Sequence, residues 1–125
     1  MSYVDFIIPG YDWHSPQFQI KTDGAATDIS GWTLTADFFW RGLNSSARID
    51  PSQVILTLTS GSSYFSIANA ASGLFEFDLV SSQTVNFDQS PTRIPGPSQK
   101  VTARITRTDG GRKDFIADVT IEVRF

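Results

Sequence analysis

The stretch "KDFIADVTIEVRF", residues 113–125, decides the fold because its apolar and polar residues alternate. One side carries Phe115, Ala117, Val119, Ile121, Val123 and Phe125, and the other carries Asp118, Thr120, Glu122 and Arg124. A period of two is typical of a half-buried β-strand. The preceding "KVTARITRT", residues 100–108, alternates in the same way, and the linking "DGGRK" tolerates the positive φ of a tight turn. The sequence therefore predicts a long C-terminal hairpin.

Further strands are predicted upstream by the same alternation, at residues 16–22, 33–40, 53–60 and 73–80, with weaker signals at 3–8 and 63–68. In "TLTADFFW" the core side holds Leu34, Ala36, Phe38 and Trp40, and in "QVILTLTS" it holds Val54, Leu56 and Leu58. No window shows a helical period, although residues 63–72 have room for one helical turn. We therefore expect an all-β protein, an antiparallel immunoglobulin-like β-sandwich of about seven to eight strands, in a single domain of residues 1–125.

Two segments do not follow the strand pattern. Residues 1–16 are apolar but interrupted by Pro9-Gly10 and Pro16, which predicts an N-terminal arm or edge strand. Residues 82–99 contain three prolines, which predicts a long proline-rich loop with room for a short strand at "TVNF", residues 84–87. Long loops are often functional. We expect protein contacts at exposed apolar residues of these two segments, namely Tyr11, Trp13, Ile94 and Pro95.

The composition excludes several classes of function. The sequence has no Cys, so disulfides, thiolate chemistry and the usual structural zinc sites are not expected. Its net charge is −3 and its basic residues are scattered, which is not the footprint of a nucleic-acid-binding protein. No apolar run approaches the ~20 residues of a membrane span, and no leader pattern opens the chain. We expect a soluble, unprocessed protein that contacts neither nucleic acid nor membrane.

Catalytic chemistry is not expected either. His14 is the only histidine, and no Gly-x-Ser-x-Gly motif accompanies it. Carboxylates lie on the polar sides of predicted strands, where solvated charges are ordinary: Glu76, Asp78, Asp114 and Asp118. A small hydrolase using them is the lowest-ranked hypothesis. The stretch "TDGAATD" lacks the alternating ligands of a calcium loop, so the sequence predicts no metal and no cofactor.

The stretch "TDGAATDISGW", residues 22–32, reads as a structural joint between strands. Asp28 and Ser30 have side chains suited to local backbone hydrogen bonds, and Gly31 can adopt an open conformation. Ile29 is expected to turn inward as a plug beside Trp32. We therefore predict that Gly31→Val lowers stability.

The order of these features resembles the small β-sandwich domains of tailed-phage virion proteins, including the N-terminal domain of baseplate upper proteins. The resemblance covers about residues 17–125 and is carried by Asp23-Gly24, Asp28-Ile29-Ser30-Gly31, Gly73, Asp109-Gly110 and Ile121-Glu122-Val123.

This resemblance implies a non-enzymatic structural or assembly protein of the baseplate, tail, neck or capsid surface. Its partners would be other virion proteins and copies of itself, and its location would be the virion after synthesis in the host cytoplasm. The alternative is a carbohydrate- or receptor-binding sandwich whose exposed aromatic rings, Trp13 among them, stack on sugars.

Overall fold

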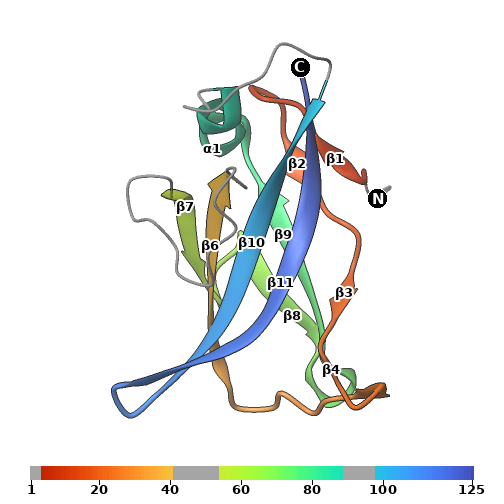
Figure 1. Ribbon diagram of the computed structural model, residues 1–125, viewed down its shortest axis with the longest axis vertical. Coiled ribbons are helices and arrows are strands. Elements are labelled where there is room, and N and C mark those ends of the chain that lie inside the picture. Colours follow the sequence, from red (N-terminus) through yellow and green to blue (C-terminus); the bar gives the residue numbers. More distant parts are fainter. Residues whose placement is uncertain (1–3, 41–53, 89–97) are drawn as a thin grey trace.

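The larger sheet is built around the predicted C-terminal hairpin. The computed structural model describes residues 4–40, 54–88 and 98–125. In these residues the sheet order is β1, β11, β10, β6 and β7, with bounds Phe6–Ile7, Arg112–Arg124, Ser98–Asp109, Thr33–Trp40 and Val54–Thr59. Only β1 runs parallel to its neighbour. The hairpin of β10 and β11 crosses the front of the molecule, and its tip projects at the lower left (Figure 1).

The smaller sheet is centred on β9, which spans Leu74–Leu79. Two short strands, β2 (Trp13–His14) and β3 (Phe18–Gln19), pair with one edge of β9, and β8 (Phe65–Asn69) pairs with the other. A separate hairpin joins β4 (Lys21–Thr22) to β5 (Ala25–Ala26). Helical turns are few in the described residues: η2 (Ala70–Ser72), α1 (Ser81–Thr84) and η3 (Val85–Asp88). The predicted all-β class is confirmed.

The two larger sheets face each other across one aromatic core. Phe38 on β6 meets Phe77 on β9 with ring centroids 5.0 Å apart, and it also meets Phe87 on η3 at 5.9 Å. Trp40 and Ile29, both predicted to be internal, are buried. Large apolar side chains at such contacts supply most of the hydrophobic stabilisation. The core therefore joins both sheets and η3, which lies against Phe38 and Trp40.

Two β-bulges change the predicted faces of the large sheet. Ile105 pairs with Ala117 but Thr106 pairs with Phe115, so Ile116 is an extra residue in β11. The prediction that Phe115 faces the core is therefore wrong, and its side chain is 62% exposed. Phe125, predicted on the same side, is also exposed at the end of the chain. A bulge inserts one residue and reverses the alternation on one side of it.

The second bulge lies between β6 and β7. Phe38 pairs with Leu56, whereas Phe39 pairs with Val54, which leaves Ile55 as the extra residue. The prediction that Val54 shares the core side with Leu56 is therefore wrong, because Phe39 lies on the outer face of the sheet.

Residues 84–87, where the sequence suggested a short strand, are helical instead. The apolar spacing of Val85 and Phe87 fits a strand, but only Phe87 is buried, in the core, while Val85 is exposed. Residues 98 and 99 at the end of the predicted loop belong to β10. Residues 82–88 of that loop are helical, in α1 and η3, and residues 89–97, including Ile94 and Pro95, lie outside the described residues.

Candidate interaction surface

A turn in the N-terminal segment is fastened to the helical segment that follows β9. The buried hydroxyl of Thr84 accepts a hydrogen bond from the Gly10 amide at 3.1 Å and donates one to the Tyr11 carbonyl at 2.7 Å. The Ser81 amide donates to the Asp12 carboxylate at 2.7 Å. Three hydrogen bonds between residues about seventy apart in sequence therefore hold the turn against α1.

The two fastened segments expose large apolar side chains. Tyr11 is 68% exposed and Val85 is 49% exposed, and Ile8 and Val80 are exposed as well. We call these four residues the turn patch. Exposed apolar residues gathered on one part of a domain are typical of protein contact sites, whereas single exposed residues are common and carry no such meaning.

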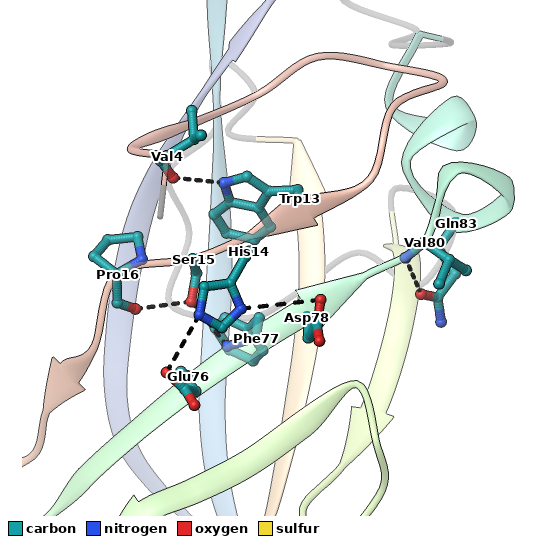
Figure 2. Close-up of polar contacts among 10 residues, drawn as sticks. All are labelled: Val4, Trp13, His14, Ser15, Pro16, Glu76, Phe77, Asp78, Val80 and Gln83. Carbon is teal, nitrogen blue, oxygen red and sulfur yellow. Dashed lines mark hydrogen bonds and ion pairs between the residues drawn. The ribbon is translucent and has the colours of Figure 1, made fainter. Parts of the chain in front are cut away.

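Two features order the helical segment of α1 and η3: hydrogen bonds at its N-terminal end, and a buried side chain in the core. The Val80 amide donates to the Gln83 side-chain oxygen at 3.0 Å, as Figure 2 shows. The Gln83 amide returns a bond to the Val80 carbonyl at 2.9 Å. Phe87, one turn further on, is fully buried. The exposed Val80 and Val85 therefore belong to a segment that the buried Phe87 side chain fixes to the core.

Trp13, expected at an exposed contact site, is buried instead, with 2% of its surface exposed. Its indole stacks on Phe77 at 6.4 Å, and its Nε1 donates to the Val4 carbonyl at 2.7 Å (Figure 2). The expectation of an exposed Trp13 is wrong because β2 pairs with β9 and turns this side chain inward. A strand of two residues gives no alternation in the sequence, so no pattern signalled it. Tyr11, two residues earlier, is exposed.

Three candidate catalytic residues come together on the outer face of the smaller sheet. His14 lies 3.8 Å from Glu76 (Nε2 to Oε2) and 4.0 Å from Asp78 (Nδ1 to Oδ1), as Figure 2 shows. His14 and Glu76 are each about a quarter exposed. The sequence did not group these residues because His14 and β9 are far apart along the chain.

The two contacts of His14 in this cluster have the distances of long ion pairs. In the part of the chain that the structure describes, His14 Nδ1 has no hydrogen-bond partner. Within the same residues, no three His, Asp or Glu side chains are placed to hold a metal ion. The other two strand acids, Asp114 and Asp118, lie on the other sheet.

Charged groups with shifted pKa values lie away from the turn patch. The Ser30 hydroxyl, with help from the Ser30 amide, lowers the pKa of Asp28. The Arg124 guanidinium lowers the pKa of Glu122. A hydrogen bond to Asp118 raises the pKa of Arg104 above its usual value. Each of these shifts arises from a local interaction between neighbouring side chains or backbone groups at the surface.

The comparisons with known proteins do not place the chain in a family. No protein-family model matches it, and no curated protein matches it either. Across residues 4–40, 54–88 and 98–125, none of the helices has the length and apolar character that crossing a membrane requires. The exposed surface of the described residues is therefore the main guide to what this chain does.

Proposed function

We propose that this chain is a non-enzymatic structural or assembly protein of a bacteriophage virion, and that it acts through protein–protein contacts. In this proposal the two facing sheets are an immunoglobulin-like β-sandwich, and the virion contains the chain as a rigid module of its baseplate, tail, neck or capsid surface. Support comes from the resemblance carried by residues 17–125 and from the joint at residues 22–32. There Asp28 accepts a hydrogen bond from the Ser30 amide at 2.9 Å, and Gly31 has a φ of +79°.

The turn patch is the observation that carries this proposal. Its exposed side chains do not hang from a free loop, because the buried Thr84 hydroxyl fixes the turn against α1. A surface that is already ordered loses less conformational entropy when a partner binds. Exposed apolar groups on such a support are therefore well suited to anchoring a neighbouring virion protein.

The carbohydrate-binding alternative required an exposed Trp13 ring, and the structure buries that ring. Trp13 is buried against Phe77 and its Nε1 is bonded to Val4, so it cannot stack on a sugar in this fold. Tyr11 remains exposed, but a single tyrosine beside aliphatic side chains fits a protein contact at least as well. A protein-contact role therefore fits the exposed residues better than a sugar-binding role.

The test is binding between this chain and the virion proteins encoded by the genes beside its own, measured by light scattering and calorimetry. Tyr11→Ser and Val85→Ser are each expected to weaken the complex about tenfold, the effect of roughly 1.4 kcal/mol at an apolar anchor. Their unfolding midpoints should stay close to that of the wild type, because both side chains are exposed.

The matched control is Tyr64→Ser, since Tyr64 is 36% exposed and lies outside the turn patch. Its binding should equal that of the wild type. A protein that stays monomeric and associates with none of these virion proteins would overturn the proposed function. Complexes that form equally well with both patch variants would show that another surface makes the contact.

A further inference from the structure

Strand β11 leaves most of one edge without a partner strand. β10 pairs with β11 from Arg112 to Arg124, and β1 meets the opposite edge only at Glu122 and Val123. Among the residues that the structure describes, no strand pairs with that edge between Arg112 and Val119, and none of these residues is buried. Unpaired backbone amides and carbonyls along a strand are a template for another strand.

The bulge sets which side chains this edge presents. Before the bulge, Lys113 and Phe115 lie on the outer face of the sheet, opposite Thr108 and Thr106 of β10. After it, Asp118 lies on the outer face, opposite Arg104. Ala117 and Val119 pair with core residues of β10, and the extra residue Ile116 packs against the core. The outer face therefore switches from odd to even residue numbers in the middle of the edge.

This switch makes the edge complementary to itself. If two copies of β11 align antiparallel, the pairs Asp114 with Val119, Phe115 with Asp118 and Ile116 with Ala117 each join residues from the same face. Moving the register by two residues sets Phe115 against Ile116, or Ala117 against Asp118, which puts an outer residue opposite a core-side one. Moving the register by one residue also places outer residues opposite core-side residues. Among these neighbouring registers, only the first keeps every pair on one face.

We infer that a second copy of this chain pairs with the free edge, β11 against β11 about a two-fold axis, so that the two large sheets become continuous. No like charges lie directly opposite one another in this register. Lys113 lies 3.8 Å from Asp37 of its own chain (Nζ to Oδ2), but its side chain is 61% exposed. In this register it lies diagonally across from Asp118 of the second copy, so a long lysine side chain can exchange one acid for the other. Because the axis repeats this contact, the opposite charges on the edge favour a copy of the same strand.

The outer face next to the edge is already ordered for this contact. Arg104 donates two hydrogen bonds to Asp118, at 2.8 and 2.9 Å, and its guanidinium lies 5.4 Å from the ring centroids of both Phe39 and Phe115. The exposed Phe115 therefore contacts Arg104 beside the edge, and the second copy would cover it. The inference deepens the proposed function and rests on its protein-contact role, but it uses a surface separate from the turn patch.

The chain has no cysteine, so a single introduced thiol reports on this pairing directly. In the inferred register the two copies of Ala117 are about 6 Å apart, which is within disulfide range. Under mild oxidation Ala117→Cys is expected to form a covalent dimer on the order of a hundredfold faster than Thr59→Cys, because pairing raises the effective thiol concentration. Thr59 is a matched control, exposed on β7, the strand at the other end of the same sheet.

A second measurement needs no cysteine. Amide exchange in wild-type β11 between Asp114 and Val119 should slow as protein concentration rises, while exchange in β7 should not change. Lys113→Asp should reverse this protection by placing acids diagonally across the axis. Equal oxidation rates for the two cysteine variants, or exchange in β11 that is independent of concentration, would overturn the inference. Normal dimerisation in Tyr11→Ser, with partner binding weakened about tenfold, would show that the two surfaces act separately.

Discussion

Among the glycines that the structure describes, Gly73 has the least room for a side chain. It ends η2 with a φ of +70°, and a Cβ built on it would lie 2.6 Å from the Thr27 carbonyl and 2.8 Å from the Ile20 carbonyl. Both neighbours are backbone atoms, which cannot move aside as a flexible side chain can. Gly73→Ala is therefore expected to lower the free energy of unfolding by more than about 2 kcal/mol, as measured by urea denaturation.

Gly31 provides the comparison, because its φ is +79° but nothing lies within 4 Å of an added Cβ. Gly31→Ala should cost only about 1 kcal/mol, the strain of the left-handed conformation alone. Gly31→Val should cost more, since a β-branched side chain is stiffer in that region. If Gly73→Ala is no worse than Gly31→Ala, the close carbonyl contacts do not determine the stability at Gly73. A fully stable Gly31→Val would contradict its assignment as a structural joint.

Asp28 gives the fold a dependence on acid. Its pKa is lowered from the usual 3.8 by the Ser30 hydroxyl and amide. A carboxylate with a depressed folded-state pKa stabilises the fold above its unfolded pKa, and that contribution disappears as the pH falls through the folded value. The difference in unfolding midpoint between wild type and Asp28→Ala should therefore be present at pH 7 and shrink below pH 3.8.

Salt distinguishes this effect from that of an ion pair. The partners of Asp28 are neutral, whereas the pKa of Glu122 is lowered first by its hydrogen bond to the charged Arg124. Added salt should therefore weaken the effect of Glu122→Gln and leave that of Asp28→Ala nearly unchanged. A pH-independent difference for Asp28→Ala would contradict the prediction.

At the scale of elements, one side chain replaces a backbone hydrogen bond to β9 that is missing between β2 and β3, the two short strands at one edge of β9. Pro16 has no amide to donate, and the ladder against β9 breaks there. Ser15 takes over, because its amide donates to the Phe77 carbonyl at 2.9 Å and its hydroxyl accepts from the Phe77 amide at 2.8 Å. The same hydroxyl donates to the Pro16 carbonyl at 2.8 Å.

Ser15→Ala would leave the Phe77 amide without its acceptor in the interior. The expected loss is about 1–3 kcal/mol in the free energy of unfolding, the usual effect of an unsatisfied buried donor. Ser63→Ala, at an exposed position, is the control and should stay within about 0.5 kcal/mol of the wild type. Hydrogen exchange at the Phe77 amide is the direct readout, and unchanged protection in Ser15→Ala would refute the role assigned to the hydroxyl.

The long strands could be predicted from the sequence, because apolar and polar residues that alternate over many positions indicate a half-buried β-strand. The strands β6, β9, β10 and β11 lie where the alternation indicated. The faces within β11 could not be fully predicted, since the extra residue Ile116 exists only relative to Ile105 and Thr106 on the partner strand. A bulge is a property of two strands, and a pattern read along one strand does not contain it.

Exposure of the candidate site residues could not be predicted from the sequence either. Tyr11 and Trp13 have the same local context, yet one is exposed and the other is buried. The difference arises because Trp13 pairs with Leu79 and the Tyr11 carbonyl bonds to Thr84, both more than sixty residues away. No local propensity encodes contacts over that distance.

At the scale of the molecule, the N-terminal segment connects the two larger sheets. β1 adds to the edge of the large sheet beside β11, and β2 adds to the small sheet beside β9. The Val4 amide donates to the His14 carbonyl at 3.0 Å, and the Trp13 indole donates to the Val4 carbonyl at 2.7 Å. Since one short segment pairs with both layers, we expect the sheets to unfold together in a single cooperative transition.

Trp13→Ala tests this connection. Removing a buried indole that stacks on Phe77 should cost about 3–5 kcal/mol, and Trp13→Phe should cost less because it keeps a ring in the cavity. Tyr11→Ala, two residues away but exposed, should change stability by no more than about 0.5 kcal/mol. Amide exchange measured on both β9 and β11 is decisive, because loss of the connection should speed exchange in both sheets of Trp13→Ala. Faster exchange in β9 alone would mean that the segment belongs to the small sheet and does not couple the two layers.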